Sequence, residues 1–294
     1  MTDIATLNDM QAARRARIRL LSTSVRYVLL FAVGLVMLYP LIWLVGASFK
    51  TNSEIFSGAG FIPENPTLDG YIRGWETSTP YTFGRFFWNS FLIILPKVIG
   101  TAISCTMAAY AFARFDFPLK KILFGSVIAI LLLPNVVTRI PQYILFRDLG
   151  WLDSFLPLWV PSAFAGDAFF VFMLVQFLRS LPSDMEEAAR VDGANSLQTL
   201  VYIVVPMLAP ALISVCLFQF MWTMNDFLGP LIYLSSVDKY PVSLALKLSI
   251  DTTEAFEWNR ILAMSVLTIA PALIVFFAAQ RYFIEGISSG GVKG

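Results

Sequence analysis

Long apolar stretches are the feature that most restricts how this chain can fold. A helix needs about 20 mostly apolar residues to cross the hydrocarbon core of a bilayer. We expect six such helices, at about residues 27–48, 87–112, 122–145, 155–178, 205–233 and 261–283. The fifth is expected to break near Asn225-Asp226. Only 14% of the residues are charged, against about 25% in soluble domains. The sequence therefore predicts an all-α, polytopic membrane protein.

The basic residues indicate how these helices are oriented. If the N-terminus is inside, the cytoplasmic segments hold more Lys and Arg than the outer ones, as the positive-inside rule requires. We expect a cytoplasmic segment at 1–26, a transmembrane domain at 27–283 and a cytoplasmic tail at 284–294, which glycine makes flexible. The outer segment at about 49–86 is expected to be an irregular loop. The protein would be a multi-pass membrane protein with both termini in the cytoplasm.

The composition argues against catalysis by this chain. It has no histidine, and its two cysteines, Cys105 and Cys216, lie in apolar stretches. Isolated thiols of this kind are typical of packed side chains rather than a metal site or a disulfide. No G-x-x-x-x-G-K-[ST] phosphate loop occurs, and a net charge of +1 gives no indication of a nucleic-acid partner. We therefore expect no catalytic residue, no metal and no bound cofactor.

The segment at 181–206 predicts two short helices outside the membrane. Ser183 followed by Glu186 has the spacing of a capping box. Gly193 is placed to end the first helix, and Ser196 is placed to cap the second.

The first of these helices combines an acidic edge with a narrow apolar face. Met185, Ala188 and Ala189 are spaced to share one face, while carboxylates occupy the first turn. This pattern favours docking into the groove of a partner protein. An amphipathic helix on the lipid surface is the alternative, which the carboxylates disfavour because anionic headgroups repel them.

The same segment resembles a known motif. Its pattern is Glu187-Ala188-Ala189, then Gly193, then Ile203, then Val205-Pro206. This resembles the EAA loop of membrane subunits of binding-protein-dependent ABC importers, in which Leu usually stands where this chain has Val205.

The remainder of the chain is similar to one branch of that family, the maltose-type carbohydrate permeases. The similarity runs from about residue 25 to the end and rests on Asn89-Ser90 and on residues 108–117, 131–154, 222–231 and 288–294. Each motif is weak alone, but their order and spacing are specific.

The resemblance implies a location in a bacterial inner membrane, a set of partners and a coupling site. A second permease would complete the pathway, two ATPase subunits would use ATP and Mg²⁺, and an external binding protein would deliver the solute. The residues expected to couple this chain to the ATPase are Glu186, Glu187, Ala188, Ala189, Asp192, Gly193 and Pro206.

Polar and aromatic residues inside the predicted helices are candidates for the solute pathway, because charge in lipid is costly. They are Lys97, Arg139, Trp222, Asn225, Asp226 and Phe227. Lys97 and Arg139 facing a cavity would favour an anionic solute, such as a uronic-acid oligosaccharide from alginate or pectin. Alternatively, they pair internally with Asp167 or Asp226.

Three other functions compete with a sugar permease. A self-contained secondary transporter or facilitator would need its own ion site or inverted repeats, and the sequence shows no repeat. A membrane enzyme would need a catalytic constellation. An ABC permease for another solute, such as glycerol-phosphate or a polyol, would keep the ABC assignment and change only the solute.

Overall fold

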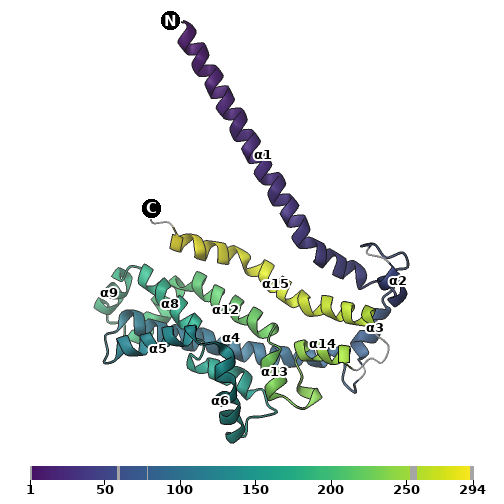
Figure 1. Cartoon of the computed structure of the whole chain (residues 1–294). Coiled ribbons are helices and arrows are strands. Elements are labelled where there is room, and N and C mark those ends of the chain that lie inside the picture. Colours follow the sequence, from purple (N-terminus) through teal and green to yellow (C-terminus); the bar gives the residue numbers. More distant parts are fainter. Residues whose placement is uncertain (1, 58–59, 78, 252–256, 292–294) are drawn as a thin grey trace. The chain divides into compact units, whose positions relative to one another are not determined.

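The structure is a computed structural model that describes residues 2–57, 60–77, 79–251 and 257–291. Within these residues the elements are helices and no strand is present (Figure 1), which confirms the predicted all-α class. The chain divides into two compact units, Met1–Tyr71 with Glu257–Val266 and Ile72–Phe256 with Leu267–Gly294.

The first unit begins with α1, a 46-residue helix at Thr2–Ala47 that contains the first predicted span. The loop expected at 49–86 is not irregular throughout, because α2 (Asn52–Ser57) and α3 (Asp69–Glu76) form within it. Threonine hydroxyls stabilise the first turns of α2 and α3. Thr51 Oγ1 accepts from the Glu54 N–H at 3.4 Å, and Thr67 Oγ1 accepts from the Asp69 N–H at 3.1 Å. Polar residues at a helix start satisfy otherwise unpaired N–H groups.

The second unit is built around α4, a 32-residue helix at Phe83–Arg114. The helices α8 (Ala168–Ser180), α12 (Ala209–Met224) and η1 (Val160–Phe164) pack on it. Figure 1 shows α8 and α12 running alongside α4. Their shared core includes Cys105, Ala109, Phe170, Leu174, Leu178, Val204, Leu208 and Val215.

The described residues contain four helical segments long and apolar enough to span a membrane, at Leu21–Ala47, Phe83–Arg114, Leu156–Ser180 and Trp258–Gln280. Two further spans are bent pairs of helices, so there are up to six if each pair counts as one span. The six predicted stretches therefore fall on these segments, but not as six straight helices.

The third predicted span is divided into α5 (Lys120–Leu132) and α6 (Asn135–Asp148). The two helices are bent by 108°. Pro134 explains the break, because it lacks an N–H donor and disfavours helical backbone at the preceding residue. Leu133 is extended accordingly, with φ −79° and ψ 131°.

The fourth predicted span is also discontinuous. It consists of α7 (Leu156–Trp159), η1 and α8, with Ala165 in the left-handed region at φ 55° between the last two. This interruption places the peptide at Asp167 beside α4, where the Cys105 thiol contacts its carbonyl at 3.9 Å.

The fifth predicted span breaks where expected, because α12 ends at Met224 and α13 begins at Leu228 (Leu228–Tyr233). A second bend of 79° at Leu208 separates α12 from the preceding helices. That bend was not predicted. Pro210, in the first turn of α12, has no N–H to donate to the carbonyl four residues earlier, which favours a bend here.

The sixth predicted span lies in α15 (Trp258–Gly291), which follows η3 (Val237–Lys239) and α14 (Val242–Asp251). The tail expected to be flexible from 284 is helical to Gly291, because each added helical residue contributes a hydrogen bond once a helix has formed. Residues 292–294 lie outside the described residues.

Candidate functional site

The first predicted coupling helix is α9, at Asp184–Val191. It ends at Gly193, as expected, with φ +87° and a bond from the Ala194 N–H to the Ala189 carbonyl at 2.9 Å. Glycine adopts this left-handed conformation without steric cost. Gly193 therefore sets the direction in which the chain leaves α9.

The predicted capping box at Ser183 is wrong. The Ser183 backbone is helical, at φ −82° and ψ −10°, and its hydroxyl caps no N–H group. It donates instead to Glu187 Oε1 at 3.0 Å. Glu186 does not return a bond to Ser183: its Oε1 accepts from Arg114, and its buried Oε2 has no hydrogen-bond partner.

An ion pair between Arg114 and Glu186 joins the end of α4 to α9. Arg114 Nε lies 2.7 Å from Glu186 Oε1, and Arg114 also donates to the Leu181 carbonyl at 3.1 Å. Glu186 is only 3% exposed. Glu186 is therefore a residue that positions α9, and not an exposed contact. Arg114, the last residue of α4, is a functional residue that the sequence reasoning missed.

The second predicted helix begins one residue earlier than expected. Asn195, and not Ser196, is the cap: Asn195 Oδ1 accepts from the Gln198 N–H, and Gln198 Oε1 accepts from the Asn195 N–H, both at 2.9 Å. This reciprocal pair is a complete capping box. The helix then continues through α10 (Ser196–Thr199), η2 (Leu200–Val204) and α11 (Val205–Met207).

Most of the predicted coupling residues are exposed, and we call the exposed residues within 184–202 the coupling surface. Pro206 lies apart from them, because it lines an apolar cavity with residues of α4 and α15. Glu187, Ala188, Asp192, Gly193 and Pro206 are exposed, and Ala189 is half-buried. Large apolar side chains are exposed with them, at Met185, Val191, Leu197, Val201 and Tyr202. Exposed apolar groups surrounded by polar ones are typical of a protein interaction site.

A polar cavity of about 260 Å³ lies within the second unit. It is lined by Lys97 of α4, Arg139 of α6, Asp167 before α8 and Asp226 between α12 and α13. Three predicted pathway residues, Lys97, Arg139 and Asp226, therefore line the same cavity. Gln142 and Tyr233 also line it, and these were not predicted.

Internal pairing, the alternative for the two cations, is not seen. Among the described residues, no ion pair joins Lys97 or Arg139 to either aspartate of the cavity. Asp167 Oδ2 accepts from Thr101 Oγ1 at 3.2 Å, and Asp226 Oδ1 accepts from the Gly229 N–H at 3.0 Å. The lining of the cavity thus includes two basic and two acidic side chains with no ion pair between them.

The other predicted pathway residues lie elsewhere. Trp222 packs against Phe170, with ring centroids 5.0 Å apart and the rings tilted by 32°. Trp222 and Asn225 line a separate, mainly apolar cavity of about 530 Å³. Phe227 is half-buried and lines neither cavity. Two neighbouring residues at the break in the fifth span thus line different cavities, Asp226 the polar one and Asn225 the apolar one.

Comparison with known proteins gives consistent matches. Residues 100–289 match the family described as binding-protein-dependent transport system inner membrane component. The arabinooligosaccharides transport system permease of Halalkalibacterium halodurans is 31% identical over 89% of this chain and 93% of its own length. The trehalose/maltose transport system permease of Thermococcus litoralis is 26% identical over 89% and 94%.

A solved structure also matches. It is a bacterial ABC transporter involved in the import of the acidic polysaccharide alginate, with a TM-score of 0.78 and 26% identity. The match covers 88% of this chain and 95% of the other.

Proposed function

Because this chain belongs to the family of binding-protein-dependent transport system inner membrane components, we propose that it forms half of the pathway of an ATP-driven importer for an oligosaccharide. The members of this family are transport permease subunits of the inner membrane. The relatives named above, which transport arabinooligosaccharides and trehalose or maltose, support a carbohydrate as the solute.

The observation that carries this proposal is the polar cavity. An ionised side chain at the centre of a bilayer costs about 2.5–3.5 kcal/mol on insertion scales. Four such residues around one cavity of a membrane domain therefore support a role for the cavity in the solute pathway. Their donors and acceptors suit the hydroxyl groups of a sugar.

A second permease would complete the site. The cavity measures about 260 Å³, below the roughly 300–1,000 Å³ of typical ligand pockets. An oligosaccharide would need further wall from another subunit, as a two-permease pathway provides.

The coupling surface would bind an ATPase subunit, which would bind ATP and Mg²⁺. Its exposed apolar side chains and Glu187 suit a groove in that partner, and Gly193 orients the two helices. In this arrangement both termini lie in the cytoplasm. An extracytoplasmic solute-binding protein would dock on the opposite side of the membrane.

For the solute itself, we propose a uronic-acid oligosaccharide. Two observations support this choice: Lys97 and Arg139 line the cavity without an ion pair, and a similar solved structure is an alginate importer. Asp167 and Asp226 bring the formal charge of the cavity to zero, which makes a neutral oligosaccharide the competing outcome.

An import assay distinguishes the two solutes. The complete importer in proteoliposomes is supplied with a uronic-acid trisaccharide or with maltotriose. We expect the double variant Lys97→Gln/Arg139→Gln to lower uronic-acid import at least tenfold and to change maltotriose import little. The exposed Lys121→Gln serves as the control. Unchanged uronic-acid import in the double variant would remove the cations from the pathway, and import without ATP would favour a facilitator.

A further inference from the structure

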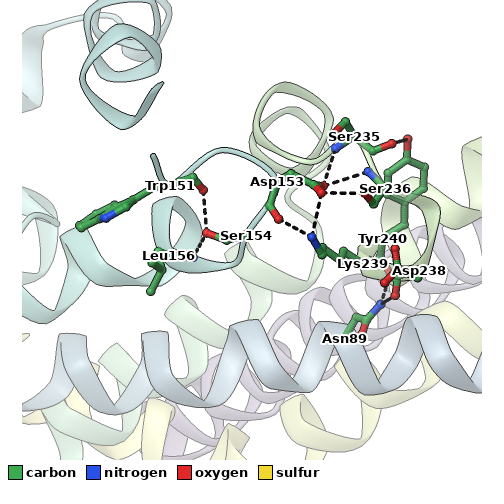
Figure 2. Close-up of polar contacts among 10 residues, drawn as sticks. All are labelled: Asn89, Trp151, Asp153, Ser154, Leu156, Ser235, Ser236, Asp238, Lys239 and Tyr240. Atoms are coloured by element: carbon green, nitrogen blue, oxygen red, sulfur yellow. Dashed lines mark hydrogen bonds and ion pairs between the residues drawn. The ribbon is translucent and has the colours of Figure 1, made fainter. Parts of the chain in front are cut away.

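A network of hydrogen bonds around Asp153 joins the loop after α6 to the segment after α13 (Figure 2). The Asp153 N–H donates to the Tyr233 carbonyl at 2.8 Å. Its carboxylate accepts from the N–H groups of Ser235 and Ser236 at 3.0 and 2.9 Å, and from the Ser236 hydroxyl at 2.6 Å. One residue thus holds three positions at the end of α13.

Lys239 closes this network, which we call the latch (Asp153, Ser235, Ser236 and Lys239). Its ammonium donates to the Asp153 carbonyl at 2.7 Å and to Oδ2 at 2.8 Å. Hydrogen bonds from Lys239 and Ser236 hold the pKa of Asp153 well below its usual range. Both side chains are only about one-third exposed, at 36% for Lys239 and 29% for Asp153, so solvent weakens this ion pair less than one at the open surface.

The backbone of Asp153 is in the left-handed region, at φ +53°. This conformation is unfavourable for residues other than glycine, although Asp and Asn adopt it more readily than most. Strained residues persist only where the surrounding structure holds them. The six hydrogen bonds described above supply that restraint, and strain of this kind points to a functional role.

The segment after α13 also forms hydrogen bonds to α4. Asn89 Nδ2 donates to the carbonyls of Asp238 and Tyr240 at 2.7 and 3.0 Å (Figure 2). Ser90 Oγ accepts from the Val242 N–H at 2.9 Å. The latch is therefore attached to the central helix of the unit.

One layer of apolar side chains separates the latch from the polar cavity. Phe146, Leu158 and Tyr233 belong to a buried cluster with Ile93 and Leu234. The first three of these also line the cavity. The rings of Phe146 and Tyr233 meet edge to face, with centroids 5.3 Å apart. A shift of α13 relative to α6 would therefore change the shape of the cavity directly.

We propose that Asp153 and Lys239 are positioning residues that fix the distance between the α6 wall and the α13 wall of the cavity. They thereby set the size of solute that the cavity admits. The inference rests on the proposed function, because it takes the cavity to be part of the solute pathway. Displacements of about 1 Å are enough to impair a site whose supporting residues are lost.

The test compares solutes of different length in the complete importer in proteoliposomes, at saturating binding protein. The probes are the tri- and hexasaccharides of whichever series, uronic-acid or malto-, the wild type imports. Asp153→Asn keeps the shape of the side chain and its tolerance of the left-handed backbone, but removes the charge. We expect the ratio of hexasaccharide to trisaccharide import to change at least threefold, and Lys239→Met to change it in the same direction.

Two controls make the result specific. Arg147 and Asp148 form an exposed ion pair at the end of α6, with side chains 57% and 61% exposed, so Asp148→Asn should leave the ratio unchanged. Lys239→Arg retains the charge and should keep the ratio within twofold of the wild type.

Each outcome bears on the inference. A drop in total import at an unchanged length ratio, in both Asp153→Asn and Lys239→Met, would make the latch merely structural and overturn the inference. If one variant fails to assemble, the other decides. The proposed function fails separately if the wild-type importer takes up neither series, or takes one up without ATP, and this outcome does not depend on the length ratio.

Discussion

The two ends of α4 use their polar groups in opposite ways. At the last residue of α4, Arg114 holds α9 through Glu186, and the helices beyond it present exposed apolar side chains and Glu187 to the outside. Near the first turns, Asn89 and the latch close a network in which backbone and side-chain groups find partners within the chain. The 32 residues of α4 span about 48 Å, more than the roughly 30 Å hydrocarbon core.

This difference indicates what each end requires. A region whose polar groups are satisfied internally keeps its shape without help, whereas exposed apolar side chains gain by burial against another protein. This difference supports the two proposals, that a partner covers the coupling surface and that the latch end holds the cavity without one.

We expect the largest effect from removing the ion pair between Arg114 and Glu186, which holds α9. Arg114→Met would leave Glu186 charged, buried and unpaired, and losing one partner of a buried pair costs about 3–5 kcal/mol. We expect a clearly lower thermal unfolding temperature in detergent and loss of ATPase binding. Arg114→Met/Glu186→Leu should regain most of the thermal stability, and a double variant as unstable as the single one would contradict this view of the pair.

We expect a smaller effect from replacing either of two glycines that have a positive φ. Gly193, at +87°, follows α9, and Gly150, at +68°, precedes the latch; an added Cβ meets no atom within 4 Å at either position. Alanine at each should cost about 1–2 kcal/mol of backbone strain. We expect similar losses of thermal stability, but a loss of ATPase binding only for Gly193→Ala. Equal loss of ATPase binding in both variants would remove the distinction between the two ends.

The smallest effect tests the start of α10. Asn195→Ala removes a cap and should cost about 1 kcal/mol, whereas Ser196→Ala, at the first helical position, should change stability by less than about 0.5 kcal/mol. Thermal unfolding of the purified permease measures both. A larger loss of stability in Ser196→Ala than in Asn195→Ala would make Ser196 the cap and contradict the capping box at Asn195.

The sequence allowed the long spans to be predicted, because their apolar length is a local property. Pro134 could be recognised as a helix breaker, but the 108° bend at that point could not be foreseen. The direction of a bend depends on what α6 packs against, and a periodic pattern does not contain that information.

The polar sites were predictable to different degrees. Lys97, Arg139 and Asp226 were chosen because charge in lipid is costly, and the structure brings them to one cavity. The pair of Asp153 with Lys239 joins positions 86 residues apart, in segments whose composition is ordinary for loops. Glu186 was expected to be a cap residue or a contact, because no local pattern revealed that Arg114 would bind it.

Copurification tests the central claim, that the coupling surface binds an ATPase subunit. The tagged chain is extracted in mild detergent as wild type, as Glu187→Lys/Gly193→Asp, and as the latch variant Asp153→Asn/Lys239→Met, and associated proteins are identified by mass spectrometry. We predict that a second permease accompanies all three and that the ATPase is lost only from the coupling-surface variant. Retention of the ATPase by Glu187→Lys/Gly193→Asp, or a wild-type chain that purifies alone and transports without ATP, would contradict the claim.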